Sequence, residues 1–277
     1  MKKEKLVSIN IPTHNSEKTL NKTLESIKNQ TYKKIETIII DSYSKDKTIW
    51  IAKKYKCRVF RYKGKLLGAR YEGAKNSRGE IILLLDSDQI LEKTAIERAV
   101  NLLRTYDILW LEEFTYKPKT FLEKLFDADR KLVQKYYENF VKVKGGVILP
   151  RIYKKEILIR AMENIPKEVL PICAAHDHAI IYYEVSKISE NIGKLPNAVW
   201  HIEPSNLIWF WKKTYRWGKT TRDLIDRGIY VDLIKSKMKF RKFYFKDFSL
   251  SIKSLILRVL RGVPYLMGYS LRKNDEK

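Results

Sequence analysis

The segment Ile81-Ile82-Leu83-Leu84-Leu85-Asp86-Ser87-Asp88 decides the fold. Its first five residues are apolar without alternation, which is typical of a strand buried on both faces of a sheet. Two aspartates follow directly. Because open α/β sheets bind ligands in the crevice beyond the carboxyl ends of their strands, we expect Asp86 and Asp88 to line such a crevice.

The spacing of these two aspartates suits a cation. Side chains at i and i+2 share one side of an extended chain, so both carboxylates can face one ion. Hard oxygen ligands favour Mg²⁺ or Mn²⁺, which usually complete their shell with substrate phosphates. The alternative is that two polar residues simply end a strand, and the motif by itself does not decide between the two.

Composition narrows the class of protein. The chain has 277 residues, 44% of them hydrophobic, and a formal net charge of +24. Such a charge favours an anionic partner: nucleic acid, a nucleotide or an anionic membrane. Cys57 and Cys173 match no zinc or redox spacing. The charged N-terminus lacks the features of a secretory signal, and no uncharged apolar run reaches the roughly 18–20 residues needed to span a bilayer. We therefore expect a cytoplasmic protein or one that faces the cytosol.

The first hundred residues alternate between strand and helix patterns. The expected strands are Leu6–Ile11, Ile35–Ile40, Arg58–Tyr62 and Ile81–Leu85, and the expected helices are Lys18–Asn29, Thr48–Tyr55, Leu67–Asn76 and Lys93–Leu103. Repeated β-α units of this length predict an α/β fold with a mostly parallel, doubly wound sheet and right-handed crossovers.

The middle of the chain has weaker patterns. They predict strands at Asp107–Leu111, Val147–Tyr153 and Ala198–His201, helices at Phe121–Val141 and Asp177–Lys187, a turn at Gly145–Gly146 and a loop over Ile165–Ala175. We place a catalytic domain at residues 1–205, with a nucleotide half over about 1–105 and an acceptor half over about 106–205.

Residues 206–277 differ from the rest in composition. They hold eighteen Lys and Arg against six Asp and Glu, which is half of the net charge, and an aromatic cluster between Trp209 and Trp217. The stretch Leu255–Ser270 mixes apolar residues with Arg258 and Arg261. A basic amphipathic helix with aromatic residues is typical of a segment that lies on an anionic membrane surface. The alternative is an ordinary amphipathic helix that covers the catalytic domain.

Two strand-to-helix turns carry polar residues near the predicted crevice. The first reads Ile11-Pro12-Thr13-His14-Asn15-Ser16-Glu17, and the second runs from Asp41 to Thr48. Backbone N–H groups and a helix N-terminus in such turns can face a nucleotide. Taken singly, each turn is equally typical of plain helix capping by Ser, Asp and Asn.

The order of four motifs is more specific than any one of them. Ile11-Pro12-Thr13-x-Asn15, Asp41-Ser-x-Ser-x-Asp46-x-Thr48, Gly68-Ala69-Arg70-x-x-Gly73 and Asp86-Ser-Asp88 follow one another along the chain. This succession resembles the inverting glycosyltransferases with the GT-A fold. More narrowly, it resembles the large family 2, which includes cellulose, chitin, hyaluronan and dolichyl-phosphate-sugar synthases. The resemblance covers residues 6–105 strongly and extends to about residue 218.

The resemblance implies roles for particular residues. It implies that a nucleotide-sugar site is formed by Pro12, Thr13, Asn15, Glu17, Asp41, Arg70, Asp86 and Asp88, with Asp41 at the base, Arg70 near the diphosphate and Asp88 on the metal. The second motif departs from the commoner Asp-Asp-Gly-Ser pattern, because Ser42 replaces an acid and Tyr43 replaces a glycine. That departure leaves the preferred base open.

Transfer of a sugar also needs groups on the acceptor side. The acceptor hydroxyl must lose a proton, normally to Asp or Glu. The resemblance favours Asp177, in Ala175-His176-Asp177-His178, as this catalytic base; alternatively Asp177 only caps the following helix. His201 is a candidate metal ligand or a plain strand-end histidine. Lys213 and Arg216 resemble a basic-aromatic helix that contacts the diphosphate, and a membrane contact is the other interpretation.

Together these features predict a metal-dependent, inverting glycosyltransferase that uses Mg²⁺ or Mn²⁺ and a UDP- or GDP-sugar donor. We expect a lipid-linked or glycan acceptor and a peripheral position on an anionic membrane at its cytosolic face. One alternative is a nucleotidyltransferase of related fold, although the first turn lacks a glycine-rich phosphate loop. The other is a basic protein that binds nucleic acid; no known nucleic-acid module is present and the basic residues are spread over the chain, so we expect no nucleic-acid partner.

Overall fold

The computed structural model describes residues 4–137, 149–237 and 242–270. These residues form one eight-stranded sheet with the order β3-β2-β1-β4-β7-β6-β8-β5. The strands are β1 (Val7–Thr13), β2 (Ile35–Asp41), β3 (Arg58–Arg61), β4 (Ile81–Leu84), β5 (Gln89–Leu91), β6 (Ile108–Thr115), β7 (Ile152–Lys154) and β8 (Ile192–His201).

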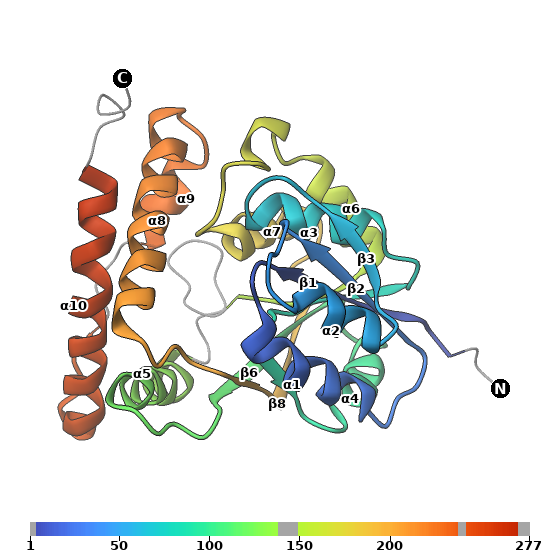
Figure 1. The fold of residues 1–277 in the computed structure, drawn as a ribbon, viewed down its shortest axis with the longest axis horizontal. Coiled ribbons are helices and arrows are strands. Elements are labelled where there is room, and N and C mark those ends of the chain that lie inside the picture. The colour runs from blue at the N-terminus through green and yellow to red at the C-terminus, as the bar shows by residue number, and fades with distance from the viewer. Residues whose placement is uncertain (1–3, 138–148, 238–241, 271–277) are drawn as a thin grey trace.

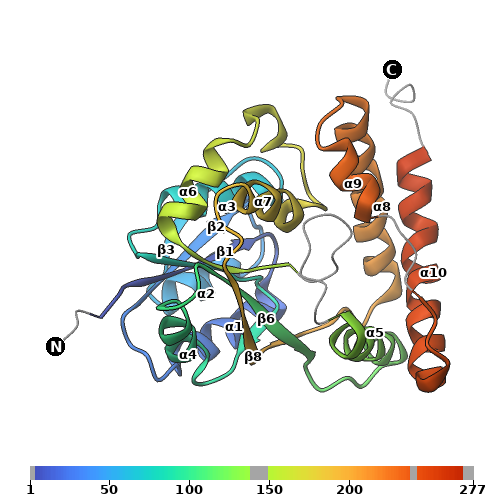
Figure 2. The ribbon, with the colours of Figure 1, turned by 180° about the vertical axis from the view of Figure 1, so that it is seen from behind.

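Helices cover the sheet and extend beyond one side of it (Figures 1 and 2). They are α1 (Glu17–Lys28), α2 (Thr48–Lys54), α3 (Leu66–Lys75), α4 (Ala95–Leu102), α5 (Phe121–Tyr137), α6 (Lys155–Glu163), α7 (Asp177–Ser186), α8 (Leu207–Asp226), α9 (Val231–Lys237) and α10 (Phe248–Ser270), with 3₁₀ turns η1 (Lys167–Val169) and η2 (Phe245–Asp247).

The apolar run from Ile81 to Leu85 lies at the centre of the sheet. Every residue from Ile81 to Leu85 is buried. Ile81 and Leu83 belong to one apolar cluster with residues of α1 and α4, whereas Ile82 and Leu84 belong to a second cluster with residues of α6 and α7. The strand is therefore covered on both faces, as its lack of alternation predicts.

The first four strands are parallel, and their carboxyl ends meet at one edge. Strands β3, β2, β1 and β4 pair in that order, with Thr13 at the end of β1 opposite Asp41 at the end of β2. Within the sheet, Asn10 of β1 lies opposite Leu84 of β4. The first and second motifs are thus brought side by side, and the aspartates that follow β4 lie beside them.

The second half of the sheet is mixed. Strand β7 pairs antiparallel with β4 and β6, and β5 pairs antiparallel with β8, whereas β6 and β8 are parallel. The predicted strand Asp107–Leu111 is longer as β6. The sequence patterns did not indicate β5 or α6, and the predicted strand at 198–201 is the end of the longer β8. The predicted Gly145–Gly146 turn, the end of the predicted helix beyond residue 137 and the start of the predicted strand at Val147 lie outside the described residues.

The C-terminal helices pack beside the sheet rather than on it. In both ribbon views α10 forms the outer edge of the molecule, next to α8 and α5 (Figures 1 and 2). Phe210 of α8 and Leu257 of α10 are buried together with Leu122, Leu125 and Phe126 of α5. Across the residues that the structure describes, no helix has the length and apolar character required to cross a membrane.

Candidate nucleotide and metal site

The carboxylate at the end of β2 is held entirely by neighbouring parts of the chain. Asp41 is fully buried and accepts a hydrogen bond from Thr13 Oγ1 at 2.9 Å and one from the Ser44 backbone N–H at 2.9 Å. Arg61 of β3 forms an ion pair with the same carboxylate. Asp41 therefore fixes the relative position of the first two motifs, in addition to any contact with a nucleobase.

The two turns are joined to each other by side chains. Asn15 has a left-handed φ of 50°, its Oδ1 accepts from the Lys45 backbone at 2.9 Å, and its N–H donates to Ser44 Oγ at 2.8 Å. Glu17 Oε2 accepts from the Lys47 backbone at 3.1 Å. Pro12 is half-buried in β1. The first two motifs thus form one continuous rim. Asn15 Oδ1 and Glu17 Oε2 already accept hydrogen bonds within this rim.

One buried arginine links the third motif to two carboxylates. Arg70 of α3 has only 1% of its surface exposed. Its Nη2 donates to Asp86 Oδ1 at 2.5 Å, and its Nε donates to Asp177 Oδ2. Nη1 is buried and has no hydrogen-bond partner among the described residues. A buried guanidinium group normally has its donors satisfied, so the unpaired Nη1 is an exception that marks this place as a candidate ligand site.

Asp86 is clamped between two arginines. Arg151, just before β7, donates from Nη1 to Asp86 Oδ2 at 2.9 Å. Burial raises the pKa of Asp86, but the charges of Arg151 and Arg70 outweigh it and leave this pKa well below its usual range. Asp86 is therefore ionised at neutral pH, and it holds both arginines at the carboxyl edge of the sheet.

Asp88 and His201 complete a group that can hold a metal. Asp86, Asp88 and His201 each offer a ligand atom, and these atoms all lie within 4.8 Å of one another. His201, at the end of β8, pairs with Gln89 of β5, so the short strand after Asp88 brings it there. Its Nε2 lies 3.4 Å from Asp88 Oδ1, which is buried without a hydrogen-bond partner among the described residues. This donor set fits a divalent cation that prefers oxygen ligands.

Glu203 orients the histidine from its other side. Its Oε2 lies 3.4 Å from His201 Nδ1, and its Oε1 accepts from Arg130 Nε at 2.6 Å. Burial lowers the pKa of His201, but Asp88 and Glu203 outweigh it and raise this pKa overall. A carboxylate behind a histidine fixes the orientation of the ring and increases its basicity as a ligand.

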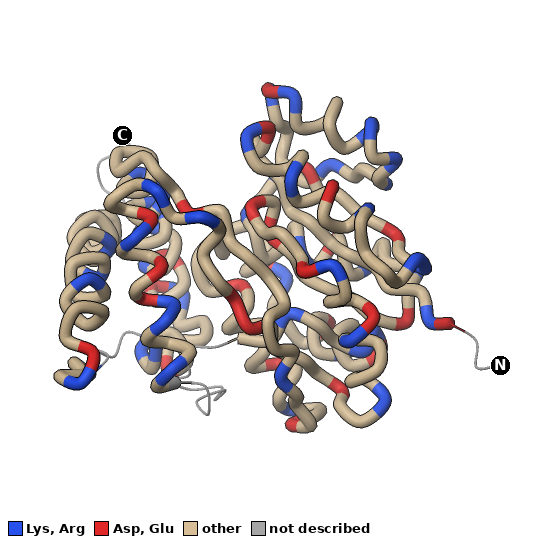
Figure 3. The backbone as a smooth tube through the Cα atoms, turned by 90° about the horizontal axis from the view of Figure 1, so that it is seen from below, with Lys and Arg blue, Asp and Glu red and all other residues tan. Residues whose placement is uncertain are grey.

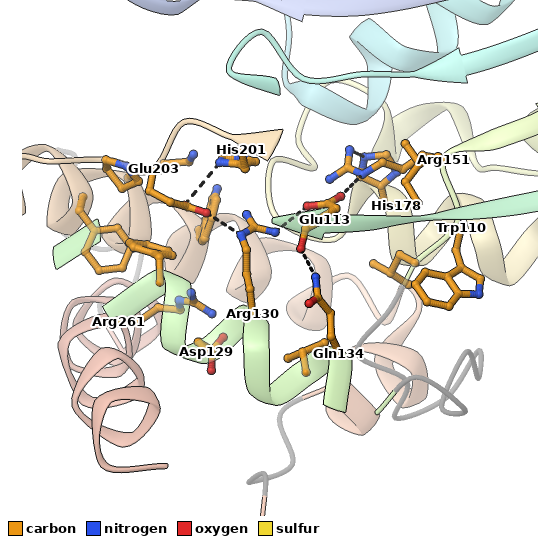
Figure 4. A pocket seen from close by; sticks show the side chains of 18 residues that line it. Trp110, Glu113, Asp129, Arg130, Gln134, Arg151, His178, His201, Glu203 and Arg261 are labelled. Carbon is orange, nitrogen blue, oxygen red and sulfur yellow. Dashed lines mark hydrogen bonds and ion pairs between the residues drawn. The ribbon is translucent and has the colours of Figure 1, made fainter. Parts of the chain in front are cut away.

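A cavity of about 340 Å³ adjoins this group (Figure 4). Glu113 of β6 faces it and receives Arg130 Nη1 at 2.6 Å and Arg151 Nε at 2.7 Å. Burial raises the pKa of Glu113, yet Arg151 and Arg130 lower it to about 2 overall. The wall beside His201 therefore alternates carboxylates and arginines, with aromatic side chains such as Trp217 completing the lining.

Sequence patterns do not indicate four further residues of the site: Glu113, Arg130, Arg151 and Glu203. Only Glu203 had a local signal, because it lies two residues after His201. The other three come from β6, α5 and the segment before β7, and nothing in their local sequence distinguishes them from surface charges. They are recognised because the tertiary structure leaves them half-buried and pairs them with one another.

Of the residues predicted on the acceptor side and on the basic helix, Asp177 and Lys213 lie at the site and Arg216 does not. Asp177, the first residue of α7, is buried and forms an ion pair with Arg70. Burial raises the pKa of Asp177, but Arg70 outweighs it and lowers this pKa overall. Lys213 lines the cavity, with its Nζ 5.1 Å and 5.2 Å from the ring centroids of Trp209 and Trp217. Arg216 is exposed and does not line the cavity.

The histidines on either side of Asp177 serve the packing around it. His178 Nε2 accepts a hydrogen bond from Arg151 Nη1 at 2.8 Å, and burial lowers the pKa of His178 to about 3. His176 hydrogen-bonds Thr221 of α8 at 3.0 Å through Nε2, and burial lowers its pKa to about 4. Both imidazoles are therefore neutral near pH 7.

Comparison with known proteins identifies a matching family profile and several similar sequences. The profile of the family described as Glycosyl transferase family 2 matches residues 8–160. The chain is 39% identical over 107 residues to the poly(ribitol-phosphate) beta-N-acetylglucosaminyltransferase TarP of Staphylococcus aureus, which covers 35% of this chain and 32% of TarP. It is 35% identical over 122 residues to the UDP-Glc:alpha-D-GlcNAc-diphosphoundecaprenol beta-1,3-glucosyltransferase WfaP of Escherichia coli. This match covers 42% of the present chain and 49% of WfaP. The chain thus spans about a third to a half of these relatives.

Solved structures share the fold over a longer range. S. aureus TarS 1-349 in complex with UDP-GlcNAc matches with a TM-score of 0.56 and 15% identity, covering 95% of this chain and 89% of that one. The mannosyltransferase PcManGT from Pyrobaculum calidifontis, in complex with GDP-Man and Mn²⁺, matches with a TM-score of 0.54 and 15% identity, covering 96% and 74%. These likenesses confirm the predicted α/β fold of GT-A type.

Proposed function

We propose that this chain, which belongs to glycosyl transferase family 2, transfers a sugar from a nucleotide-diphospho-sugar to an acceptor. The observation that carries the proposal is the meeting of Asp86, Asp88 and His201 at the carboxyl edge of the sheet, beside Arg70. Departure of a nucleoside diphosphate from a sugar creates negative charge, and a cation with arginine donors is what stabilises such charge.

Each donor-side residue has one task in this proposal. Asp88 and His201 would hold Mg²⁺ or Mn²⁺, with Asp86 beside them, and a bound ion would neutralise the diphosphate as it leaves. Arg70 directs its unpaired Nη1 to the donor. The rim against the nucleotide is formed by Pro12, Thr13, Asn15, Glu17 and Asp41. Among these residues, we assign the contact with the nucleobase to Asp41. Two structural neighbours are complexes with UDP-GlcNAc or with GDP-Man and Mn²⁺, which supports this donor class for the fold.

Asp177 is the proposed catalytic base on the acceptor side. It is ionised, and Arg70 ties it to Asp86, so the base and the donor site are held by one side chain. Asp177 would take the proton of the acceptor hydroxyl while its oxygen attacks the sugar carbon from the side opposite the nucleoside diphosphate. The bond from the sugar carbon to the diphosphate oxygen breaks as the new bond forms, which gives inversion at that carbon. An acceptor that is already a phosphate anion would need no base. Asp177 would then only hold Arg70 in place.

We further propose a lipid-linked or otherwise membrane-bound acceptor, reached from the cytosolic face. Support comes from the basic, aromatic helices after residue 205 and from the activity of WfaP, which acts on a diphosphoundecaprenol-linked sugar. Lys213, at the cavity, is placed to meet a phosphate of donor or acceptor. In this proposal residues 1–205 carry the chemistry and residues 206–277 form the region that meets the membrane.

A ligand panel tests the function. Thermal unfolding is measured with UDP, GDP and their sugars, each with Mn²⁺, Mg²⁺ or chelator. A ligand that binds only the folded chain raises the midpoint, so one nucleotide should stabilise the protein with metal and much less with chelator. Hydrolysis or transfer of the same nucleotide's sugar should then follow. Absence of any metal-dependent stabilisation across the panel would contradict the proposal.

A further inference from the structure

The outer face of α10 is apolar along nearly its whole length. Its exposed residues recur at intervals of three or four, so they lie on one side of the helix. Six of them mark the line of this face: Phe248, Ile252, Leu255, Val259, Val263 and Leu266. At 1.5 Å per residue the face is roughly 27 Å long. An exposed apolar surface of this extent marks an interaction site rather than a solvated surface.

The charges on α10 are all positive. The helix contains Lys253, Arg258 and Arg261 and no acidic residue from Phe248 to Ser270. Lys253 is exposed and Arg258 half-buried. On a helical projection at 100° per residue they fall on opposite sides of the apolar line. Figure 3 shows basic residues spread over the whole backbone, α10 included.

These features favour lipid over another protein as the partner. A protein interface carries about one hydrogen bond per 100–200 Å², whereas the middle of this face presents no polar side chain. Apolar residues with cations at their edges are what a helix needs to lie in an anionic membrane surface. The exposed Trp209 and Trp211, early in α8, add side chains of the type enriched at membrane–water boundaries.

The helix is also fixed to the catalytic region. A Cβ on Gly218 of α8 would lie 1.9 Å from the backbone oxygen of Tyr265, and a Cβ on Gly268 of α10 would lie 2.1 Å from that of Tyr215. The two helix backbones therefore touch at these glycines. Helix α8 also supplies Lys213 and Trp217 to the cavity. Because α8 and α10 are in contact, a surface bound by α10 has a fixed position relative to the cavity.

We propose that the outer face of α10 is a docking surface for an anionic phospholipid bilayer, on which the helix lies parallel to the membrane plane. This inference rests on the proposed function in one respect: it identifies where a membrane-bound acceptor is met. The docking itself requires no catalytic activity. Failure of one proposal is thus separable from failure of the other.

The test is co-sedimentation of the full chain with vesicles of phosphatidylcholine, with and without phosphatidylglycerol. We expect binding to the anionic vesicles that weakens at high salt. Val259→Glu, in the middle of the face, should lower the partition coefficient at least about tenfold, because burial of one such side chain contributes roughly that factor. Val259→Lys should also weaken binding, which separates insertion of the apolar face from simple charge attraction.

The matched control is Trp50→Glu, at an apolar side chain of α2 that is 63% exposed, where Val259 is 55% exposed. It should bind vesicles like the wild type. Both variants should keep the thermal shift given by the preferred nucleotide, which shows that the fold and the donor site are intact. Particle mass is measured in parallel by light scattering.

Four outcomes would overturn the inference. They are no sedimentation of the wild type, equal binding to neutral vesicles, unchanged binding of Val259→Glu, or a dimer that this substitution dissociates while vesicle binding is absent. The last result would assign the face to a second copy of the chain. Loss of nucleotide stabilisation with normal vesicle binding would instead count against the proposed function alone.

Discussion

Arg70 donates a hydrogen bond from Nε to Asp177, a residue 107 positions later in the chain. The same guanidinium binds Asp86 through Nη2. One buried side chain therefore connects the carboxylate proposed as base with a carboxylate of the proposed metal site. In the proposed reaction, the planar guanidinium group of Arg70 therefore sets the position of Asp177, on the acceptor side, relative to Asp86, on the donor side.

The first prediction concerns the base. Asp177→Asn keeps the shape of the side chain but cannot accept the proton, so kcat should fall about 10²–10⁴-fold with little change in KM for the donor. The control is Glu163→Gln, at an exposed acid of α6, which should leave the rate unchanged. Steady-state kinetics on both variants give the answer, and near-normal turnover of Asp177→Asn would show that it is not the base.

The second prediction concerns the link itself. Arg70→Met removes the partner of the buried Asp177 and of the half-buried Asp86, and should lower the free energy of unfolding by roughly 3–5 kcal/mol in denaturant titrations. Arg70→Lys keeps the charge but loses the planar fork, and should recover only part of this loss. A Lys variant as stable as the wild type would mean that charge alone, without the two-way geometry, holds this site together.

The third prediction concerns the metal. Asp88→Asn and His201→Gln should each weaken Mn²⁺ binding at least about tenfold in titrations followed by electron paramagnetic resonance, since each removes a proposed ligand. Glu203→Gln removes a residue that lies behind His201 and is not itself a proposed ligand, so it should weaken Mn²⁺ binding by no more than roughly 10–100-fold. The exposed Glu97→Gln on α4 is the control. Wild-type Mn²⁺ affinity in Asp88→Asn would place the metal elsewhere.

The fourth prediction concerns pH. Burial lowers the pKa of His176 to about 4 in the folded chain, below the unperturbed value of about 6.5 in the unfolded chain. Between these values the unfolded chain binds more protons, so stability falls as pH falls from about 6.5 to 4, by up to about 3 kcal/mol from this group. His176→Gln should remove that part of the slope in unfolding measurements across this range. An unchanged slope would assign the acid sensitivity to other groups.

The fifth prediction concerns the contact between α8 and α10. Gly218→Ala places a methyl group against the backbone of Tyr265, which cannot move aside as a side chain can, so it should destabilise the fold by roughly 1–3 kcal/mol. Gly262→Ala is the control on α10: nothing lies within 4 Å of the added Cβ. Because alanine favours helix over glycine, this variant should be slightly more stable. Equal effects of the two substitutions would argue against the close helix crossing.

The first half of the sheet and the motifs at its edge can be read from the amino-acid sequence alone. Strands such as Ile81–Leu85 are continuous apolar runs, and the turns that follow them are local in sequence, so both can be recognised without knowledge of distant contacts. The spacing of Asp86 and Asp88 likewise lets both carboxylates face one cation, but it is equally compatible with a plain strand end. His201 was indicated only as a candidate, because no local pattern shows what a strand end faces.

Which charged residues belong to the site depends on tertiary contacts. Arg151, Glu113 and Arg130 look like ordinary charged residues in the sequence, and they became part of the site because the antiparallel pairing of β7 and the position of α5 bury them against Asp86 and His201. The tertiary structure also decided which side of α10 stays exposed: periodicity shows that a helix has an apolar side, whereas packing on α8 and α5 determines which apolar residues remain uncovered. Burial of a charge and exposure of an apolar face are both properties of what lies opposite, and the chain order alone does not contain that information.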